Sequence, residues 1–328
     1  MKVVVFQGRP DVDYITRDEM VQEWKSSFQK LGITDYEIKN SFDPNRANEQ
    51  IDQDVNAVVG VYVNGEIFSQ EFFKNHPNLK YVATMAHGFG KIDPKTIEDG
   101  VTYTNTVYGN MTIAEYSLAL LMETMHHIQK ENDFYRHELD LGIPGFSTCT
   151  RQMELYGKTV GVIGIGSIGM CFAKMVSSFG THVLGYSRHI KTDPEYDFIE
   201  QVSLDELLER SDIISIHTPL TDETRHMINE ESIKKMKDGV ILINTARGDI
   251  VDEDALYDAL MSRKIYAAGL DVVSGEPRST KSKIFDCRNA IITRHIAWLP
   301  REARIRAVHI ASENVANWIN GKPTSVIR

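Results

Sequence analysis

Short apolar runs alternate with segments of helical periodicity along the first hundred residues. Residues with helical spacing lie between Met20 and Leu31, and a shorter helix is predicted near Glu71. Strands that alternate with helices predict a parallel sheet covered by helices on both faces. The apolar runs predicted to form its strands are residues 3–6, 36–39, 57–62, 80–85 and 101–105.

The pattern changes at Thr112, where one long apolar helix is predicted over residues 112–128. It is too apolar for an ordinary surface helix, so we expect it to be buried between domains or between subunits. His126 and His127 are adjacent, cannot face one metal ion, and are interpreted as ordinary helix residues. A loop with Gly142, Pro144 and Gly145 is expected to follow.

A second alternating α/β unit is predicted from residue 158 onward. Its helices include residues 204–210 and 253–261. The predicted strands are residues 158–163, 182–186, 213–217, 240–244, 266–271 and 290–293. The chain is therefore expected to contain two α/β units in sequence.

A glycine turn joins the first strand of the second unit to a helical segment, in the order Gly164-Ile-Gly166-Ser167-Ile168-Gly169. The first glycine permits a tight turn, the second lets the backbone approach a pyrophosphate, and the third lets helix pack on strand. The N–H groups of the following helix favour phosphate binding. Because the turn lies between a strand and a helix, it predicts a dinucleotide site rather than a merely glycine-rich turn.

Composition and charge narrow the class of protein. The 328 residues are 42% hydrophobic and 25% charged, as in a globular protein of two domains. A net charge of -10 argues against a nucleic-acid surface and a membrane-binding basic patch. No apolar stretch has transmembrane length, the N-terminus turns polar too early for a signal peptide, and the three cysteines form no CxxC pair that would suggest a metal site. We expect a cytoplasmic protein.

Three polar residues follow three of the predicted strands in the second unit. Arg247 follows residues 240–244, Glu276 follows residues 266–271, and His295 comes after the last strand. Each has an ordinary alternative: a surface ion pair for Arg247, a loop acid for Glu276 and a helix-entry cap for His295. However, the carboxyl ends of parallel strands share one edge, where ligands bind, so their joint occurrence predicts an active site.

Several motifs resemble the D-isomer-specific 2-hydroxyacid dehydrogenase family. They are GKTVGVIGIGSIG, HTPLTDETRHMIN, ILINTARGDIVDEDAL, GLDVVSGEP and HIAW. The resemblance is close over residues 101–319, whereas the first hundred residues match chiefly at LKYVATMAHGFGKID. It implies an α/β fold with two doubly wound parallel-sheet domains. A Rossmann cofactor domain, residues 105–298, would be inserted into a flavodoxin-like substrate domain, residues 1–104 plus 299–328. It also implies a homodimer built around the helix near Thr112.

The same resemblance assigns roles to the residues of the site. Arg247 would bind the carboxylate and carbonyl of a 2-oxo acid, and His295 would donate a proton to the carbonyl oxygen as hydride arrives. Glu276 would orient the imidazole and favour its protonated form. Backbone N–H groups of His87 and Gly88 would hold the substrate carboxylate, although smaller apolar residues are more usual in the family where this chain has His87.

The cofactor-binding residues implied by the resemblance follow several strands. They are Gly164, Gly166, Ser167, Ile168, Gly169, Ser187, Arg188, His217, Thr218, Pro219, Thr224, Thr245, Ala246, Arg247, Asp271 and His295. An NAD-selecting enzyme places an acid at the end of its second strand, to accept hydrogen bonds from both ribose hydroxyls. Ser187 replaces that acid here, and Arg188, His189 and Lys191 add donors suited to a phosphate. We therefore expect a preference for NADP(H), with NAD(H) as the alternative and Arg188 stacked on adenine in that case.

The activity expected is reduction of a small 2-oxo acid, such as glyoxylate or hydroxypyruvate, to the D-2-hydroxy acid. Trp298 after His295, and the segment EARIRA, resemble the glycerate dehydrogenase and hydroxypyruvate reductase branch more than the D-lactate branch. Two alternatives remain: a dinucleotide-sensing binding protein of the co-repressor type, and a dehydrogenase of the D-lactate or phosphoglycerate type. Turnover of NADPH with glyoxylate separates the enzyme from the binding protein.

Overall fold

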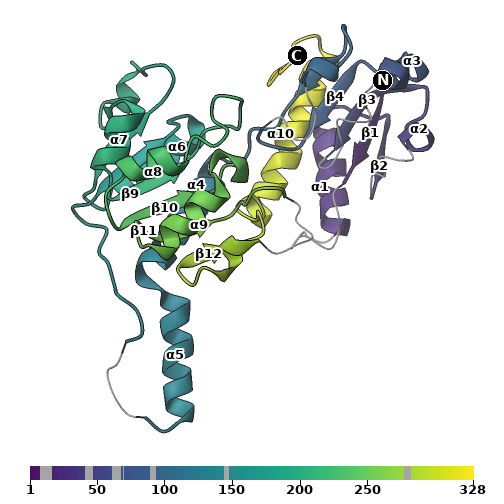
Figure 1. Ribbon diagram of the computed structural model, residues 1–328. Helices are drawn as coiled ribbons and strands as arrows, with labels where there is room; N and C mark the ends of the chain where they lie inside the picture. The colour runs from purple at the N-terminus through teal and green to yellow at the C-terminus, as the bar shows by residue number, and fades with distance from the viewer. Residues whose placement is uncertain are drawn as a thin grey trace. The chain divides into compact units, whose positions relative to one another are not determined.

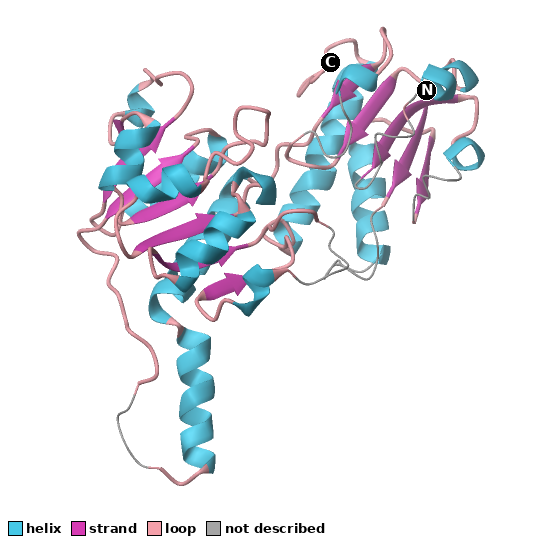
Figure 2. Ribbon diagram, in the orientation of Figure 1, coloured by secondary structure: helices cyan, strands magenta, loops and turns pink. Residues whose placement is uncertain are grey.

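A computed structural model describes residues 1–7, 17–40, 47–60, 68, 70–88, 94–143, 148–276 and 282–328. The chain forms two compact units, one comprising Met1–Gly109 with Trp298–Arg328 and the other Asn110–Ala297 (Figure 1). Each unit is built on a parallel sheet with helices on both faces (Figure 2). The predicted fold class is confirmed.

The sheet of the first unit has the strand order β2-β1-β3-β4-β5, and every pair in it is parallel. This is the order of flavodoxin-like folds. Its strands are β1 (Lys2–Phe6), β2 (Tyr36–Lys39), β3 (Val55–Gly60), β4 (Tyr81–Thr84) and β5 (Thr102–Thr104). Its helices are α1 (Arg17–Lys30), α2 (Ala47–Gln50), α3 (Gln70–Asn75) and α10 (Arg301–Ile319).

Alternation along the strands gives this sheet two apolar faces. Val3 and Val5 pack with residues of α1 and α10, whereas Val4 and Phe6 pack with residues of α3 on the opposite face. Side chains that alternate along a strand point to opposite faces, so a run of consecutive apolar residues fits a strand that is covered twice. Residues 61 and 62, the end of a predicted strand, lie outside the described residues.

The sheet of the second unit has the strand order β12-β11-β10-β9-β6-β7-β8, again parallel throughout. The order reverses between β6 and β9, as in a Rossmann fold. Its strands are β6 (Thr159–Ile163), β7 (His182–Tyr186), β8 (Glu200–Gln201), β9 (Ile213–Ile216), β10 (Val240–Asn244), β11 (Ile265–Leu270) and β12 (Ala290–Ile292). Its helices are α4 (Asn110–His126), α5 (Ile128–Asp140), α6 (Ser167–Ser177), α7 (Leu204–Arg210), α8 (Glu230–Lys235) and α9 (Glu253–Met261).

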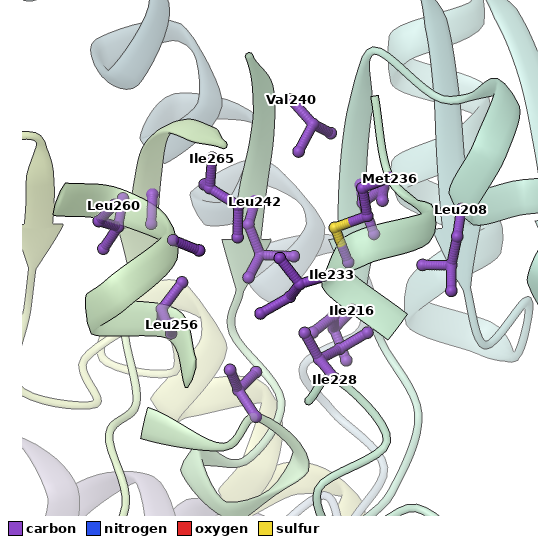
Figure 3. Packing of buried hydrophobic residues seen from close by; sticks show 14 of the residues in the cluster. Leu208, Ile216, Ile228, Ile233, Met236, Val240, Leu242, Leu256, Leu260 and Ile265 are labelled. Carbon is purple, nitrogen blue, oxygen red and sulfur yellow. The ribbon is translucent and has the colours of Figure 1, made fainter. Parts of the chain in front are cut away.

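The core on one face of this sheet fixes the strands whose ends carry the candidate site. Figure 3 shows Leu242 of β10 beside Ile233 of α8, with Leu256 and Leu260 of α9 nearby. These side chains are buried, and burying each stabilises the fold by about 1.5–3 kcal/mol. The opposite face packs against α4 and α6.

The predicted helix over residues 112–128 is wrong in one respect. α4 ends at His126, His127 adopts a left-handed conformation with φ 49°, and α5 starts at Ile128. His127 is therefore not an ordinary helix residue. The buried side chains of α4 pack on α6 and on β10 and β11 of its own unit. The predicted position of this helix between domains or subunits stays a prediction.

The helix α5 was not predicted from the sequence. None of its residues is buried. In Figure 1 it extends from the end of α4 and stands clear of the sheet of its unit. Pro144 and Gly145 of the predicted loop after it lie outside the described residues.

Candidate active site

The glycine turn lies between β6 and α6 and has the geometry that a dinucleotide requires. Gly164 has φ 93°, in the left-handed region that favours glycine. A Cβ on Gly166 would meet no atom within 4 Å among the described residues, so the space beside it is open. α6 begins at Ser167, and among the described residues no side chain caps its N-terminus. Its first N–H groups are therefore available to phosphate oxygens.

The turn also packs tightly against its neighbours. A Cβ on Gly164 would lie 2.7 Å from the backbone nitrogen of Thr218, in the loop that follows β9. A Cβ on Gly169 would lie 2.0 Å from the carbonyl oxygen of Gly164. The loops after β6 and β9 thus meet where the strand order reverses, which is where Rossmann folds bind dinucleotides. The residues present fit such a cofactor.

The loop after β9 holds four of the predicted cofactor-binding residues, namely His217, Thr218, Pro219 and Thr224. The Thr224 hydroxyl donates to the carbonyl oxygen of Pro219 at 2.7 Å, and this bond closes the loop. His217 Nε2 lies 2.9 Å from the Ser215 hydroxyl, and its ring packs on Phe172. Burial lowers the pKa of His217 to about 3, so the ring is neutral at physiological pH.

The loop after β7 carries the basic residues predicted to select the cofactor. The Ser187 hydroxyl donates to the carbonyl oxygen of His189 at 2.6 Å. Gln201 fixes the far end of this loop, because its side chain bonds both the N–H and the carbonyl of Lys191, at 2.8 and 2.7 Å. Arg188 lies between these two fixed points with its side chain exposed. The Arg188 side chain is therefore accessible to a ligand and extends from a loop whose backbone is fixed.

Arg247 is presented by the loop that follows β10. The buried side chain of Asn244 holds both ends of this loop: it accepts from the N–H of Ala246 at 3.0 Å and donates to the carbonyl oxygen of Arg247 at 2.9 Å. Thr245 is fixed from the other side by Ser117 of α4, 2.8 Å between hydroxyl oxygens. Such a turn holds the Arg247 backbone in one conformation.

Glu276 and His295 come together, although they follow different strands. Glu276 Oε2 lies 3.0 Å from His295 Nδ1, and Glu276 Oε1 accepts from the N–H of Val273 at 2.7 Å. The side chain of His295 is 40% exposed and that of Glu276 is 25% exposed. Desolvation lowers the pKa of Arg247 and the charge of Glu276 opposes that shift, so this carboxylate acts on Arg247 as well. A carboxylate on Nδ1 fixes the imidazole ring and directs Nε2 to its other side.

Asp271 fixes the turn that carries His295. Its buried carboxylate accepts from the Thr293 hydroxyl at 2.7 Å and from the N–H groups of Ile296 and Ala297, each at 2.9 Å. Burial raises the pKa of Asp271, and these donors oppose the shift. His295 itself has φ 54°, a left-handed conformation that the surrounding turn maintains. The cofactor contact predicted for Asp271 stays a prediction.

His87 and Gly88 belong to the first unit and follow β4. Asn105 Nδ2 donates to the carbonyl oxygen of His87 at 2.7 Å, which fixes this part of the loop. Phe89 and Gly90, which come next in the motif LKYVATMAHGFGKID, lie outside the described residues. The substrate contact predicted for His87 and Gly88 stays a prediction.

Three residues near the site were missed by the sequence analysis. Asn244, Asp249 and Ser274 hold the loops that carry Arg247 and Glu276. Asn244 stands at a strand end before a turn, where a side-chain amide often bonds the backbone two residues on, and this signal could have identified it. The contact between Asp249 and Ser274 joins two loops and leaves no trace in either segment of sequence.

Fold and turn together define a dinucleotide-binding protein. Comparison with known proteins gives the family: residues 118–297 match the D-isomer specific 2-hydroxyacid dehydrogenase, NAD binding domain. The chain is 38% identical over 270 residues to the hydroxypyruvate reductase of Blautia hydrogenotrophica, covering 81% of this chain and 84% of that protein. It is 38% identical over 282 residues to the glyoxylate reductase of Pyrococcus furiosus, covering 84% and 83%. A solved structure of an acyclic imino acid reductase, in complex with NADPH and D-Arg, has a TM-score of 0.83 at 26% identity over the whole of both chains.

The chain belongs to the D-isomer specific 2-hydroxyacid dehydrogenase family, which confirms the resemblance described above. It is an oxidoreductase that binds a nicotinamide dinucleotide. These matches favour an enzyme over the dinucleotide-sensing alternative. Within the described residues, no helix combines the length and apolar character needed to span a membrane. The same residues contain no cluster of His, Cys, Asp or Glu that could hold a metal ion.

Proposed function

We propose that this protein reduces a small 2-oxo acid to the corresponding D-2-hydroxy acid, with Arg247, Glu276 and His295 as its catalytic residues. The observation that carries the proposal is the 3.0 Å contact between Glu276 and His295, formed beside the Arg247 loop at one edge of a dinucleotide-binding sheet. An acid and a histidine held in this way provide a proton donor whose ring is already oriented. We assign the unit Asn110–Ala297 to the cofactor domain and the other unit to the substrate domain; the bounds expected from the resemblance, 105–298, differ from these at both ends.

Arg247 binds and activates the substrate in this proposal. Its planar guanidinium offers parallel donors, which suit a carboxylate and the neighbouring carbonyl oxygen of a 2-oxo acid. These donors stabilise the negative charge that develops on the carbonyl oxygen during reduction. The turn built by Asn244 holds the backbone from which the guanidinium extends, and Nη1 donates to the carbonyl oxygen of Ala246 at 2.6 Å.

His295 supplies the proton. The nicotinamide, when bound, supplies the hydride to the carbonyl carbon. His295 then transfers a proton from its ring nitrogen to the carbonyl oxygen, and in the reverse direction it takes the hydroxyl proton. Glu276 orients the ring for this transfer, because its carboxylate oxygen lies at 3.0 Å from Nδ1.

Glyoxylate and hydroxypyruvate are the substrates we favour, since relatives that cover most of the chain are named hydroxypyruvate reductase and glyoxylate reductase. A panel of 2-oxo acids compared by kcat/KM with NADPH is expected to rank these two above pyruvate and above branched or aromatic acids. The enantiomer of the product is determined by chiral chromatography, and the D-form is expected. A large preference for branched or aromatic acids would refute the substrate proposal.

We further propose that the protein forms a homodimer through α5. Ile128, Tyr135 and Leu139 are spaced so that they share one face of this helix, and they are 63%, 56% and 57% exposed. Leu141 and Ile143 extend the apolar surface beyond the helix end. An apolar stripe on a helix with no buried residue is a self-complementary surface for a second copy of the chain.

Light scattering is expected to give the mass of two chains for the wild type. The double variant Tyr135→Glu with Leu139→Glu is expected to shift the mass to one chain at micromolar concentration, because charges are placed in an apolar interface. Met261→Glu is the matched control: this residue is 59% exposed at the end of α9, and the mass should not change. A monomeric wild type would contradict the proposal.

The cofactor and the cellular location complete the proposed function. We favour NADPH over NADH because Arg188 is exposed on an anchored loop and Ser187 replaces the usual acid. We also place the protein in the cytoplasm, since Cys149, Cys171 and Cys287 are all free thiols.

A further inference from the structure

Asp249 joins three loops that carry proposed site residues. Its carboxylate accepts from the Ser274 hydroxyl at 2.6 Å, in the loop after β11, and from Arg225 at 2.9 Å, in the loop after β9. Its own loop, after β10, also carries Arg247. The carbonyl oxygen of Asp249 accepts in addition from the N–H of His226 at 2.9 Å.

The contact with Ser274 leads to the catalytic pair by a short path. Ser274 follows Val273, whose N–H holds Glu276 Oε1 at 2.7 Å. The other oxygen of Glu276 faces His295 Nδ1. A bond that fixes Ser274 therefore fixes the turn in which Glu276 is held.

The backbones of the two loops also touch. A Cβ on Gly248, next to Asp249, would lie 2.2 Å from the carbonyl oxygen of Val273 and 2.4 Å from the nitrogen of Ser274. The backbones of the loops after β10 and β11 are therefore packed so closely that no side chain fits between them at Gly248. The Asp249–Ser274 bond lies beside it and holds the loops together.

We propose that Asp249, through Ser274, is a positioning residue that holds Glu276 in register with His295 and Arg247. The inference rests on the proposed function of these three residues. It concerns a contact between two loop residues and adds no group that touches the substrate or the cofactor.

Charges around the contact agree with this role. The Ser274 hydroxyl and the Arg225 guanidinium hold the pKa of Asp249 below its usual range, so the acceptor is a carboxylate at physiological pH. Among the described residues, Arg225 and His226 act on the charge of Asp249, and Glu253 Oε2 accepts from the N–H of Ser274 at 3.3 Å on the other side of the contact. The acids that act on His295 are Glu276 and Asp271. A hydrogen bond to an ionised acceptor is about twice as strong as a neutral one, which suits a bond that must hold a catalytic loop.

The test uses the pH profile of kcat for reduction, measured on the full-length protein. Glu276→Gln is the reference: it replaces the carboxylate that faces the imidazole by a neutral amide, and the alkaline limb of the profile is expected to move toward acid. Ser274→Ala and Asp249→Ala are expected to move the limb in the same direction and to lower kcat about 10-fold, since small misplacements in an active site cost up to about 100-fold. Asp249→Asn keeps an oxygen acceptor for Ser274 and should restore most of kcat.

Two further variants make the outcome decisive. Arg225→Ala removes the second side chain that bonds the Asp249 carboxylate and leaves Ser274 in place. The Arg225 side chain is 50% exposed, so this variant should have kcat and a pH profile near those of the wild type. Added to Glu276→Gln, Ser274→Ala should change kcat by no more than about twofold, because both substitutions act through the same carboxylate.

The outcomes separate the positioning role of Asp249 and Ser274 from the proposed function of Glu276. A wild-type profile for Ser274→Ala, together with a shifted profile for Glu276→Gln, would overturn the inference and leave the proposed function standing. A lower kcat for Ser274→Ala without a shift would also overturn it, since that result indicates a structural role only. An unshifted profile for Glu276→Gln would remove Glu276 from the proposed function, and the inference with it. If Asp249→Ala does not fold, the Ser274→Ala result alone decides.

Discussion

Replacing His295 by alanine is expected to lower kcat for 2-oxo acid reduction by about 10²–10⁴-fold, the usual contribution of general acid catalysis. The proton would then have to come from water, which lacks the orientation that Glu276 gives the imidazole. KM should change much less, because the proton is transferred in the transition state and contributes little to ground-state binding. Steady-state kinetics with NADPH and glyoxylate measure both parameters.

The chain offers a matched control for this substitution. His182 also faces a carboxylate, with Nε2 at 2.6 Å from Glu200, but it lies on the surface at the start of β7. His182→Ala should leave kcat unchanged.

Arg247→Ala tests the second half of the same assignment. It is expected to lower kcat/KM by a factor of at least about 100, because the developing charge on the carbonyl oxygen loses its donors. Arg247→Lys should recover only part of this loss, since an ammonium group cannot offer the parallel donors of a guanidinium. Near-normal rates for both His295→Ala and Arg247→Ala would refute the catalytic assignment.

The regular elements were largely predictable from the sequence. The bounds of β10, α7 and α9 agree with the prediction to the residue, because buried strands and amphipathic helices carry a strong periodic signal. The short elements α8 and β8 were missed. α8 has six residues, and its start is set by the capping box of Asn229 and Ser232 rather than by periodicity.

The break between α4 and α5 could not be predicted in the same way. Helical spacing continues through His127, and no proline or glycine marks the change. Only the left-handed backbone at this residue ends the helix. The exposed apolar face of α5 is likewise defined by what packs against it, which a sequence pattern does not specify.

The residues of the candidate site could be predicted from the sequence, but the contacts that hold them could not. That Arg247, Glu276 and His295 follow strand ends could be predicted, and the structure brings Glu276 and His295 to 3.0 Å. Their catalytic roles stay predictions. The contacts that hold them, from Asn244 within one loop and between Asp249 and Ser274 across two loops, depend on side-chain positions that periodicity and motifs do not determine.

The cofactor preference depends on the few residues that follow β7. Ser187 uses its hydroxyl within the loop, and Gln201 anchors Lys191, so Arg188 extends from a backbone that is held on both sides. The Thr221 hydroxyl and, to a smaller extent, Arg188 hold the pKa of Glu223 below its usual range, which places these two charges on facing loops. A 2′-phosphate would compete with Glu223 for Arg188, and its charge is the larger.

Wild-type kcat/KM is therefore expected to be higher with NADPH than with NADH by about 10-fold or more, since a hydrogen bond to a charged group contributes about 1.5–3 kcal/mol. Raising the ionic strength should reduce this ratio, because the charges involved are exposed. Ser187→Asp combined with Arg188→Ala is expected to reverse the order: the new carboxylate repels the 2′-phosphate and accepts hydrogen bonds from the ribose hydroxyls. Arg210→Ala, which removes an exposed arginine on α7 that pairs with Glu200 and Glu206, is the control and should leave the ratio unchanged. A wild-type enzyme that prefers NADH would refute the cofactor proposal, and the family assignment would stand.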